Sequence, residues 1–341
     1  MKKTIWQSPS NIALVKYWGK HGFQLPNNPS VSFTLSNSTS ITEIEQVEKN
    51  SNKIQFFFEG KNNEDFARRI KKYFDKISEI FPFLNDYSFI IKSSNNFPHS
   101  AGIASSASAF SALALCIVDL AKQNGIETSN FYQTASNIAR MGSGSACRSI
   151  YGGVNLWGKH NEIAGSSDEF AIKLNDVNDI FYTYNDDIVI IDSGKKPVSS
   201  SLGHNLMDTN PFKEQKYKRA FQNTRELYNA MQTADLDKFI DITEEEALSL
   251  HAMMSLSKPS FILMKPESLQ VINIIRRYRK EKNVPVCFTL DAGPNVHILY
   301  PDAYKNSVQE MLNDLQEEIA DISIINDKVG NGSKKLPASN R

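Results

Sequence analysis

Hydrophobic and polar residues alternate along two segments near the N-terminus, residues 4–16 and 30–45, and a period of two predicts β-strands. A turn rich in Pro and Asn at 26–29 separates these segments. In residues 64–80 the apolar positions instead recur every three or four residues, which predicts an amphipathic helix. The first part of the chain therefore mixes strands and helices.

The same patterns predict the remaining elements. We expect further strands at 53–58, 87–92, 154–158, 188–192, 286–290, 296–300 and 321–325. We expect further helices at 104–123, 129–140, 211–231, 235–250 and 266–282. This order predicts an α+β protein with two domains, residues 1–186 and 187–330. A tail at 331–341, rich in Gly, Ser, Asn and Lys, is expected to be disordered.

Composition narrows the class of protein. A chain of 341 residues with 40% hydrophobic residues can bury a substantial core. Because 38 Lys and Arg balance 38 Asp and Glu, nothing indicates nucleic acid or an anionic membrane as a bulk partner. Three scattered cysteines do not make a disulfide framework, and no apolar run is long enough to span a membrane. We therefore expect a cytoplasmic protein whose partners are small molecules.

Acidic residues avoid part of the chain. The segments 1–42, 87–118, 128–161 and 193–207 contain no Asp or Glu, yet they hold ten Lys or Arg. Core strands and helices explain some of this bias, because acidic residues are rare there. The bias also indicates that these segments meet around one polyanionic small molecule, which a nearby carboxylate would repel.

The segment 95–110, NNFPHSAGIASSASAF, runs from a Pro and small-residue loop into an apolar helix. A helix N-terminus presents free N–H groups and the positive end of a dipole. Gly102 permits close approach of the backbone to a ligand, and Ser105, Ser106 and Ser108 carry hydroxyls, so a phosphate is one candidate occupant. A serine-rich helix N-terminus that caps itself remains the alternative.

Three further motifs carry chemistry: Asn11–Lys20, the basic turn Gly142–Ser149, and Asp291–Asn295. Together with the serine-rich segment they supply cations, hydroxyls and one carboxylate, which is what phosphoryl transfer to a hydroxyl needs. Asp291 alone is equally consistent with capping a turn. The G-x-x-x-x-G-K-[ST], G-x-S-x-G and H-E-x-x-H motifs are absent from the sequence, which removes the main support for P-loop, serine hydrolase and zinc peptidase classes. The basic run 68–72 is expected to be a solvated helix face.

These four motifs, in this order, resemble those of diphosphomevalonate decarboxylases, which are members of the GHMP kinase superfamily. The resemblance extends over residues 5–330. It implies an N-terminal domain of the ribosomal-protein-S5-domain-2-like type with a left-handed βαβ unit, a ferredoxin-like C-terminal domain, and a homodimer. It also implies ATP as co-substrate, Mg²⁺, and decarboxylation of 5-diphosphomevalonate to isopentenyl diphosphate after phosphorylation of its 3-hydroxyl.

The resemblance assigns roles to individual residues. Asp291 and Lys16 match the catalytic pair, and Arg148 matches the arginine that engages the substrate carboxylate. The implied substrate-binding residues are Asn11, Tyr17, Trp18, Gly19, Lys20, Ser143, Gly144, Ser145, Arg148 and Ser201. The implied ATP-binding residues are Pro98, Gly102, Ser105, Ser106 and Ser108. No residue is assigned to the metal.

Two features depart from the family pattern. Lys20 is followed by His21-Gly22 instead of the common Arg-Asp, and residues 199–201 lack an arginine that some members carry nearby. Lys195, Lys196 or His204 are candidates to replace that arginine. A decarboxylase acting on the 5-monophosphate, a mevalonate 3-kinase and a catalytically silent nucleotide-binding protein therefore remain alternatives, although the presence of Asp291 and Lys16 argues against the last.

Overall fold

The two strands predicted from alternation form the centre of the larger sheet. In the computed structural model, which describes residues 2–98, 103–194 and 200–337, β1 (Lys2–Val15) pairs antiparallel with β4 (Ser30–Glu48). Their register shifts at Pro9/Asn11 and at Ala13/Val15, and such irregularities bend a strand pair. The two halves of β4 have different neighbours, because its start pairs with β8 (Val154–Trp157) and its end with β7 (Tyr87–Asn95).

The strand order of this sheet is β14-β1-β4-β7-β5-β6, with β8 on β4 and β9 on β8. Its other strands are β5 (Ile54–Phe58), β6 (Lys61–Asn62), β9 (Ala171–Lys173) and β14 (Lys334–Leu336). A separate hairpin joins β2 (Lys20–His21) to β3 (Leu25–Pro26). The pair β5 and β7 is parallel and is connected through a helix, so it forms a βαβ unit.

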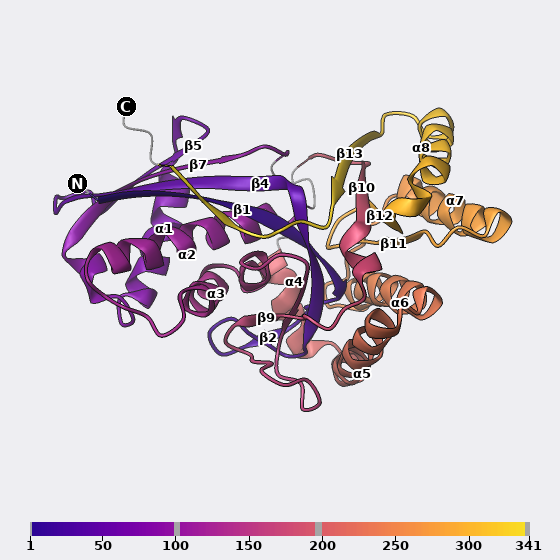
Figure 1. The fold of residues 1–341 in the computed structure, drawn as a ribbon, viewed down its shortest axis with the longest axis horizontal. Coiled ribbons are helices and arrows are strands. Elements are labelled where there is room, and N and C mark those ends of the chain that lie inside the picture. Colours follow the sequence, from indigo (N-terminus) through magenta and orange to yellow (C-terminus); the bar gives the residue numbers. More distant parts are fainter. Residues whose placement is uncertain (1, 99–102, 195–199, 338–341) are drawn as a thin grey trace.

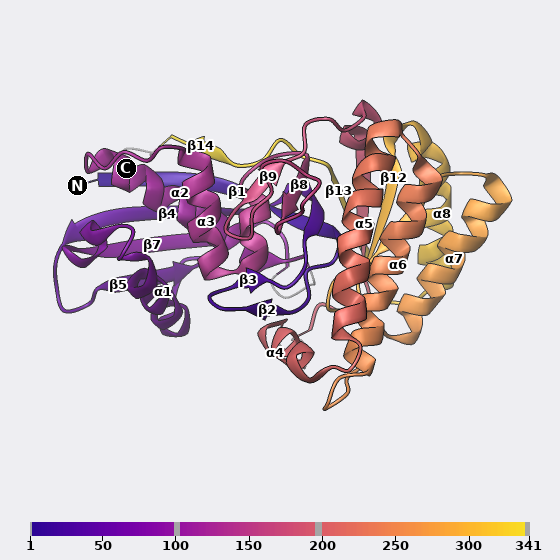
Figure 2. The ribbon, with the colours of Figure 1, turned by 90° about the horizontal axis from the view of Figure 1, so that it is seen from below.

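Three helices cover one face of this sheet, as Figure 2 shows: α1 (Glu64–Ile77), α2 (Ser105–Gln123) and α3 (Phe131–Gly142). Their apolar faces meet Trp6, Ile44 and Phe89 in one buried cluster. Contrary to the expectation from the sequence, helix α2 is long and apolar enough to cross a membrane by length and composition, but 78% of that stretch is buried inside the protein. It is therefore the central core helix, and this explains its nearly continuous hydrophobic sequence.

The second sheet has the order β11-β12-β10-β13. Its strands are β10 (Tyr184–Ile190), β11 (Cys287–Thr289), β12 (Val296–Pro301) and β13 (Ser323–Lys328). The helices of this half are α4 (Ser200–Leu206), α5 (Lys213–Thr233), α6 (Leu236–Ser255), α7 (Pro266–Lys282) and α8 (Lys305–Glu318), of which α5 to α8 pack side by side at one end of the molecule (Figures 1 and 2). Short 3-10 turns complete the fold.

The two sheets share a buried cluster. Ile12 and Phe33, on the bent ends of β1 and β4, pack with Ile188 of β10 and with Leu227 and Phe239 of α5 and α6. A second link is Asp327, which accepts hydrogen bonds from the backbone N–H groups of residues 36–38 at 2.7–2.9 Å. The ends of β1 and β4 are therefore fixed against the second sheet.

The structure corrects the expectation for the C-terminal tail and adds a helix to those expected. The tail is not disordered as far as residue 337, because β14 pairs with β1 through Ile5↔Leu336. Its glycines permit close backbone crossings: a Cβ at Gly330 would lie 2.3 Å from the carbonyl oxygen of Leu35. Helix α8 was not predicted, and strand β10 begins at Tyr184, before the expected domain boundary.

Candidate active site

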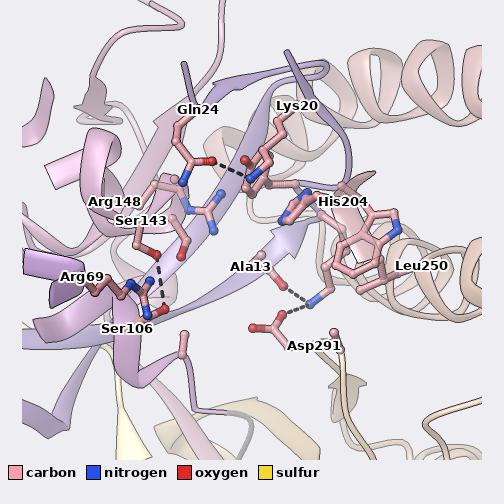
Figure 3. Close-up of a pocket in the computed structure, with 18 residues that line it drawn as sticks. Ala13, Lys20, Gln24, Arg69, Ser106, Ser143, Arg148, His204, Leu250 and Asp291 are labelled. Carbon is pink, nitrogen blue, oxygen red and sulfur yellow. Dashed lines mark hydrogen bonds and ion pairs between the residues drawn. The ribbon is translucent and has the colours of Figure 1, made fainter. Parts of the chain in front are cut away.

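A cavity lies where the bent end of β1, the N-terminus of α2 and the loop after β11 meet (Figure 3). The segment after β1 contributes Lys16, Tyr17 and Trp18, and the turn after α3 contributes Ser143 to Ser145. The lining also includes Ala13, Lys20, Gln24, Arg69, Ala104, Ser106, Gly142, Arg148, His204, Leu250, Asp291 and Ala292. Segments distant in sequence, including all three further motifs, therefore converge on one cavity.

Lys16 and Asp291 form an ion pair across the two halves of the chain. The Nζ atom of Lys16 lies 3.1 Å from Oδ1 of Asp291 and donates a second hydrogen bond to the carbonyl oxygen of Ala13 at 2.6 Å. The lysine side chain is only 1% exposed, whereas that of Asp291 is 27% exposed. Burial lowers the pKa of Lys16, and the charge of Asp291 opposes that shift. Asp291 thus presents a carboxylate to the cavity with a cation beside it.

Arg148 is buried and lies across the cavity from Asp291 (Figure 3). Its Nε and Nη2 atoms donate to Oδ1 of Asn11 at 3.4 and 3.2 Å, and Nη1 donates to the hydroxyl of Ser30. Asn11 is fixed in turn, because its amide nitrogen donates to Oγ of Ser149 at 2.7 Å. Asn11 therefore orients the arginine from behind instead of facing the cavity itself.

Helix α2 opens toward the cavity at Ala104 and Ser106. Ala104 adopts the left-handed conformation, with φ of 43°, immediately before the first helical residue. The hydroxyl of Ser106 lies 3.2 Å from that of Ser143 in the turn after α3 (Figure 3). Two hydroxyls and a helix N-terminus therefore meet at this end of the cavity, an arrangement that suits a phosphate group.

The other predicted ATP-binding residues that the structure describes do not line this cavity. Ser108 is fully buried and shares a hydrogen bond of 2.6 Å with Ser40 on β4, so its hydroxyl is directed into the protein. Ser105 begins α2 without lining the cavity, and Pro98 is exposed outside it. Gly102 falls outside the described residues.

Aromatic rings form the wall beside Lys20. The centroid of the Tyr17 ring lies 4.6 Å from the ring centroid of Trp157 and 4.2 Å from that of His204. Nδ1 of His204 accepts a hydrogen bond from the backbone N–H of Gly19 at 3.0 Å. Burial, and then the charges of Lys20 and Arg148, lower the pKa of His204 to about 3, so its imidazole is neutral.

Two glycines permit close packing around Tyr17 and Lys20. A Cβ at Gly144 would lie 2.8 Å from the hydroxyl oxygen of Tyr17. Gly19 has φ of +97°, and a Cβ there would lie 2.1 Å from the hydroxyl oxygen of Tyr217. Both glycines therefore shape the wall, although Gly19 does not itself line it.

Some cavity residues were missed or misassigned from the sequence. The basic run 68–72 was expected to be wholly solvated, but Arg69 lines the cavity and lies beside Ser106 (Figure 3). Leu250 and Gln24 also line it, and no local motif marks either residue. Of the candidates to replace the family arginine, His204 lies in the cavity, and Lys195 and Lys196 fall outside the described residues. Ser201, a predicted substrate-binding residue, belongs to α4.

The donor set suits a metal ion that arrives with a nucleotide. Within residues 2–98, 103–194 and 200–337, no group of three or more His, Cys, Asp or Glu residues is arranged to hold a metal ion. Among the described residues that line the cavity, Asp291 is the sole carboxylate, and it is already paired with Lys16. Mg²⁺ is commonly held by phosphate oxygens, waters and few protein oxygens, and the hydroxyls of Ser106 and Ser143 are available for that.

The fold and this cavity define a class. A crystal structure of mevalonate diphosphate decarboxylase from Staphylococcus aureus superposes with a TM-score of 0.87 at 31% identity, covering 98% of both chains. A structure titled MDDEF in complex with MVAPP, AMPPCP and magnesium has a TM-score of 0.86 at 29% identity and covers 98% of this chain and 99% of that one. The protein thus has the α+β GHMP kinase fold.

Comparison with family models identifies a narrower group than the fold does. Residues 8–171 match the diphosphomevalonate decarboxylase-like N-terminal domain, and residues 188–338 match the mevalonate 5-diphosphate decarboxylase C-terminal domain. Diphosphomevalonate decarboxylase from Ganoderma lucidum is 30% identical over 332 residues, covering 89% of this chain and 80% of the relative. The chain belongs to the diphosphomevalonate decarboxylase family.

Proposed function

We propose that the protein catalyses ATP-dependent decarboxylation of (R)-5-diphosphomevalonate, releasing isopentenyl diphosphate, ADP, phosphate and carbon dioxide. The observation that carries this proposal is the Lys16–Asp291 ion pair, which faces the same cavity as Arg148 and the N-terminus of α2. A base for a hydroxyl, a cation for a carboxylate and a phosphate-binding helix end are therefore within one cavity. The complex of the related MDDEF with MVAPP, AMPPCP and magnesium supports the same assignment of ligands.

In the first step, Asp291 accepts the proton of the substrate 3-hydroxyl while that oxygen takes the γ-phosphoryl group of ATP. The ammonium of Lys16, 3.1 Å from Asp291, stabilises the negative charge that develops on the oxygen. Ser106 and Ser143 donate hydrogen bonds to the phosphate oxygens at the end of α2. Mg²⁺ bound with the nucleotide, beside the hydroxyls of Ser106 and Ser143, would neutralise charge on those oxygens.

In the second step, the C3–O bond breaks and its electron pair leaves with the phosphate. The bond between C2 and the carboxyl carbon then supplies two electrons to form the C2=C3 double bond, and carbon dioxide departs. Arg148 holds the carboxylate in the orientation required, since its guanidinium is fixed by Asn11 and Ser30. Tyr17, Lys20 and His204 line the part of the wall that we assign to the 5-diphosphate.

The decisive experiment compares mevalonate, its 5-phosphate and its 5-diphosphate with magnesium and ATP, and measures ADP and carbon dioxide together. Equal release of both products from the 5-diphosphate supports the proposal. Preference for the 5-phosphate would indicate a monophosphate decarboxylase, and ADP without carbon dioxide would indicate a 3-kinase. Nucleotide binding without turnover of any substrate would indicate a catalytically silent protein.

The proposal extends to a cytoplasmic homodimer, which the family resemblance and the balanced composition support. Light scattering after size-exclusion chromatography tests the dimer, because a monomer mass at micromolar concentration would contradict it. Cell fractionation tests the location.

A further inference from the structure

A buried ion pair lies behind Lys16, outside the cavity. Glu246 on α6 is fully buried, and its Oε2 atom accepts a hydrogen bond of 2.6 Å from Nζ of Lys216 on α5. Its Oε1 atom accepts one of 2.8 Å from the amide of Asn223. Removing two charges from water costs free energy, and burial of such a pair is weak evidence for a gain in stability. The pair therefore calls for an explanation other than folding.

The third partner of Glu246 is the main chain of the candidate catalytic lysine. Oε2 of Glu246 accepts a hydrogen bond of 3.0 Å from the backbone N–H of Lys16, the first residue after β1. The same helix reaches the other half of the catalytic pair, because Nε2 of His251 lies 3.0 Å from the carbonyl oxygen of Asp291. Helix α6 thus contacts the backbone at both Lys16 and Asp291, which come from different halves of the chain.

We infer that Glu246, charge-balanced by Lys216, is a positioning residue: it fixes the main chain of Lys16 and holds its ammonium group opposite Asp291. This inference rests on the proposed function of Lys16 and Asp291. Fixing the backbone matters because Lys16 folds back onto the carbonyl of Ala13, so a small shift of its main chain moves Nζ relative to the carboxylate. A displacement of about 1 Å at a reacting centre can reduce a rate about 100-fold.

The charge of Glu246 also acts on the lysine. Asp291 on the loop after β11 and Glu246 on α6 both raise the pKa of Lys16, whereas burial and Arg148 lower it. Lys216 on α5 and His251 on α6 are the other titratable groups that contact these carboxyl residues. Loss of the negative charge at Glu246 therefore lowers the pKa of Lys16 further, so that it loses its proton at a lower pH.

The test uses the double variant Lys216→Met/Glu246→Gln, which removes the pair as a unit and leaves no isolated buried charge. Its matched control is Arg219→Met/Glu245→Gln, a half-exposed ion pair of 2.7 Å between the same two helices. We expect the control to keep kcat and its pH profile. The double variant should lose between about 10- and 100-fold in kcat, because the side chain that fixes the main chain of Lys16 loses its own partner.

Two single variants keep the test valid if the double variant does not fold. Glu246→Asp keeps the charge but shortens the side chain, so kcat should fall while the alkaline limb stays in place. Glu246→Gln keeps the shape but removes the charge, so the limb should move. Superimposable profiles and equal kcat values in the folded variants and the control would overturn the inference. Absence of turnover by the unmodified protein would instead contradict the proposed function.

Discussion

Substitution of Arg148 by lysine tests how the site recognises a carboxylate. A guanidinium has five N–H donors. The structure uses three of them, because Nε and one hydrogen of Nη2 point to Asn11 and one hydrogen of Nη1 points to Ser30. Two N–H groups remain, one each on Nη1 and Nη2, the two nitrogens that form the end-on fork of a guanidinium. This is the arrangement that binds both oxygens of a carboxylate.

Lysine cannot reproduce that arrangement. Its single ammonium can satisfy Asn11 or Ser30 and one carboxylate oxygen, so at least one hydrogen bond to the carboxylate is lost. Hydrogen bonds to charged groups contribute about 1.5–3 kcal/mol each. Loss of one therefore lowers kcat/KM for the acid substrate about 10- to 150-fold, since about 1.4 kcal/mol corresponds to a factor of ten.

The assay follows ADP and carbon dioxide at saturating ATP while the concentration of 5-diphosphomevalonate is varied. Arg140→Lys is the matched control, because Arg140 is also buried but donates to protein groups, among them the carbonyl oxygen of Glu169 at 2.8 Å, and does not line the cavity. We expect the control, per folded molecule, to change kcat/KM less than threefold. Full activity of Arg148→Lys would refute the two-point contact.

Three further predictions concern other parts of the site and its support. Asp291→Asn removes the proton acceptor and should lower kcat about 10²- to 10⁴-fold with ATP affinity within about threefold by calorimetry; a kcat within tenfold of the original would exclude Asp291 as the base. Ser106→Ala should lower kcat/KM for ATP about 10- to 150-fold, from a lost hydrogen bond to a charged phosphate oxygen, and an equal change for the acid substrate would contradict a phosphate contact. Asp327→Ala leaves the N–H groups of residues 36–38, of which that of Ser38 is buried, without their acceptor and should reduce the free energy of unfolding by about 3 kcal/mol in urea titration.

Patterns of hydrophobic residues predicted the strongly periodic elements because their burial is one-sided or complete. Strands β1 and β4 and helix α2 lie within a few residues of the expected bounds. Helix α8 carried a usable signal that was overlooked: Val308, Met311, Leu312 and Leu315 follow helical spacing and are all buried.

Strand β14 had no such local signal. The segment around Lys334 is polar, and its strand conformation depends on hydrogen bonds to β1, more than 300 residues earlier in the chain. Glycines contribute to a composition that is typical of disorder, but here the fold requires them. Gly330 and Gly332 pass so close to other backbone segments that a Cβ would not fit. Pairing of this kind is a property of the whole fold and cannot be deduced from a short window.

The residues of the site also fall into two groups, those that sequence motifs predicted and those that only the folded structure reveals. Lys16, Arg148 and Asp291 lie in motifs whose residue types indicate phosphoryl transfer, and the structure brings all three to one cavity. Arg69 lies on a helix that no chemical motif marks, so only the packing of α1 beside the cavity reveals it, whereas His204 was one of the three candidates named from the sequence to replace the family arginine. Ser108 shows the opposite error, because its motif suggested a ligand contact while the helical rotation directs its hydroxyl to Ser40.

The distribution of charge explains why the candidate catalytic carboxylate, that of Asp291, comes from the second half of the chain. The acid-free segments of the first half supply Lys16, Lys20 and Arg148 to the cavity, which is suited to hold two polyphosphates but has no base of its own. Asp291 is delivered from the loop after β11, at the contact between the two sheets. Phosphoryl transfer then requires the two halves of the chain to keep their relative position. Two contacts cross the boundary between them, those of Asp327 with residues 36–38 and of α6 with Lys16. These contacts hold Lys16 and Asp291 at their separation. A mutation that loosens this boundary should therefore reduce kcat before it reduces binding of either substrate.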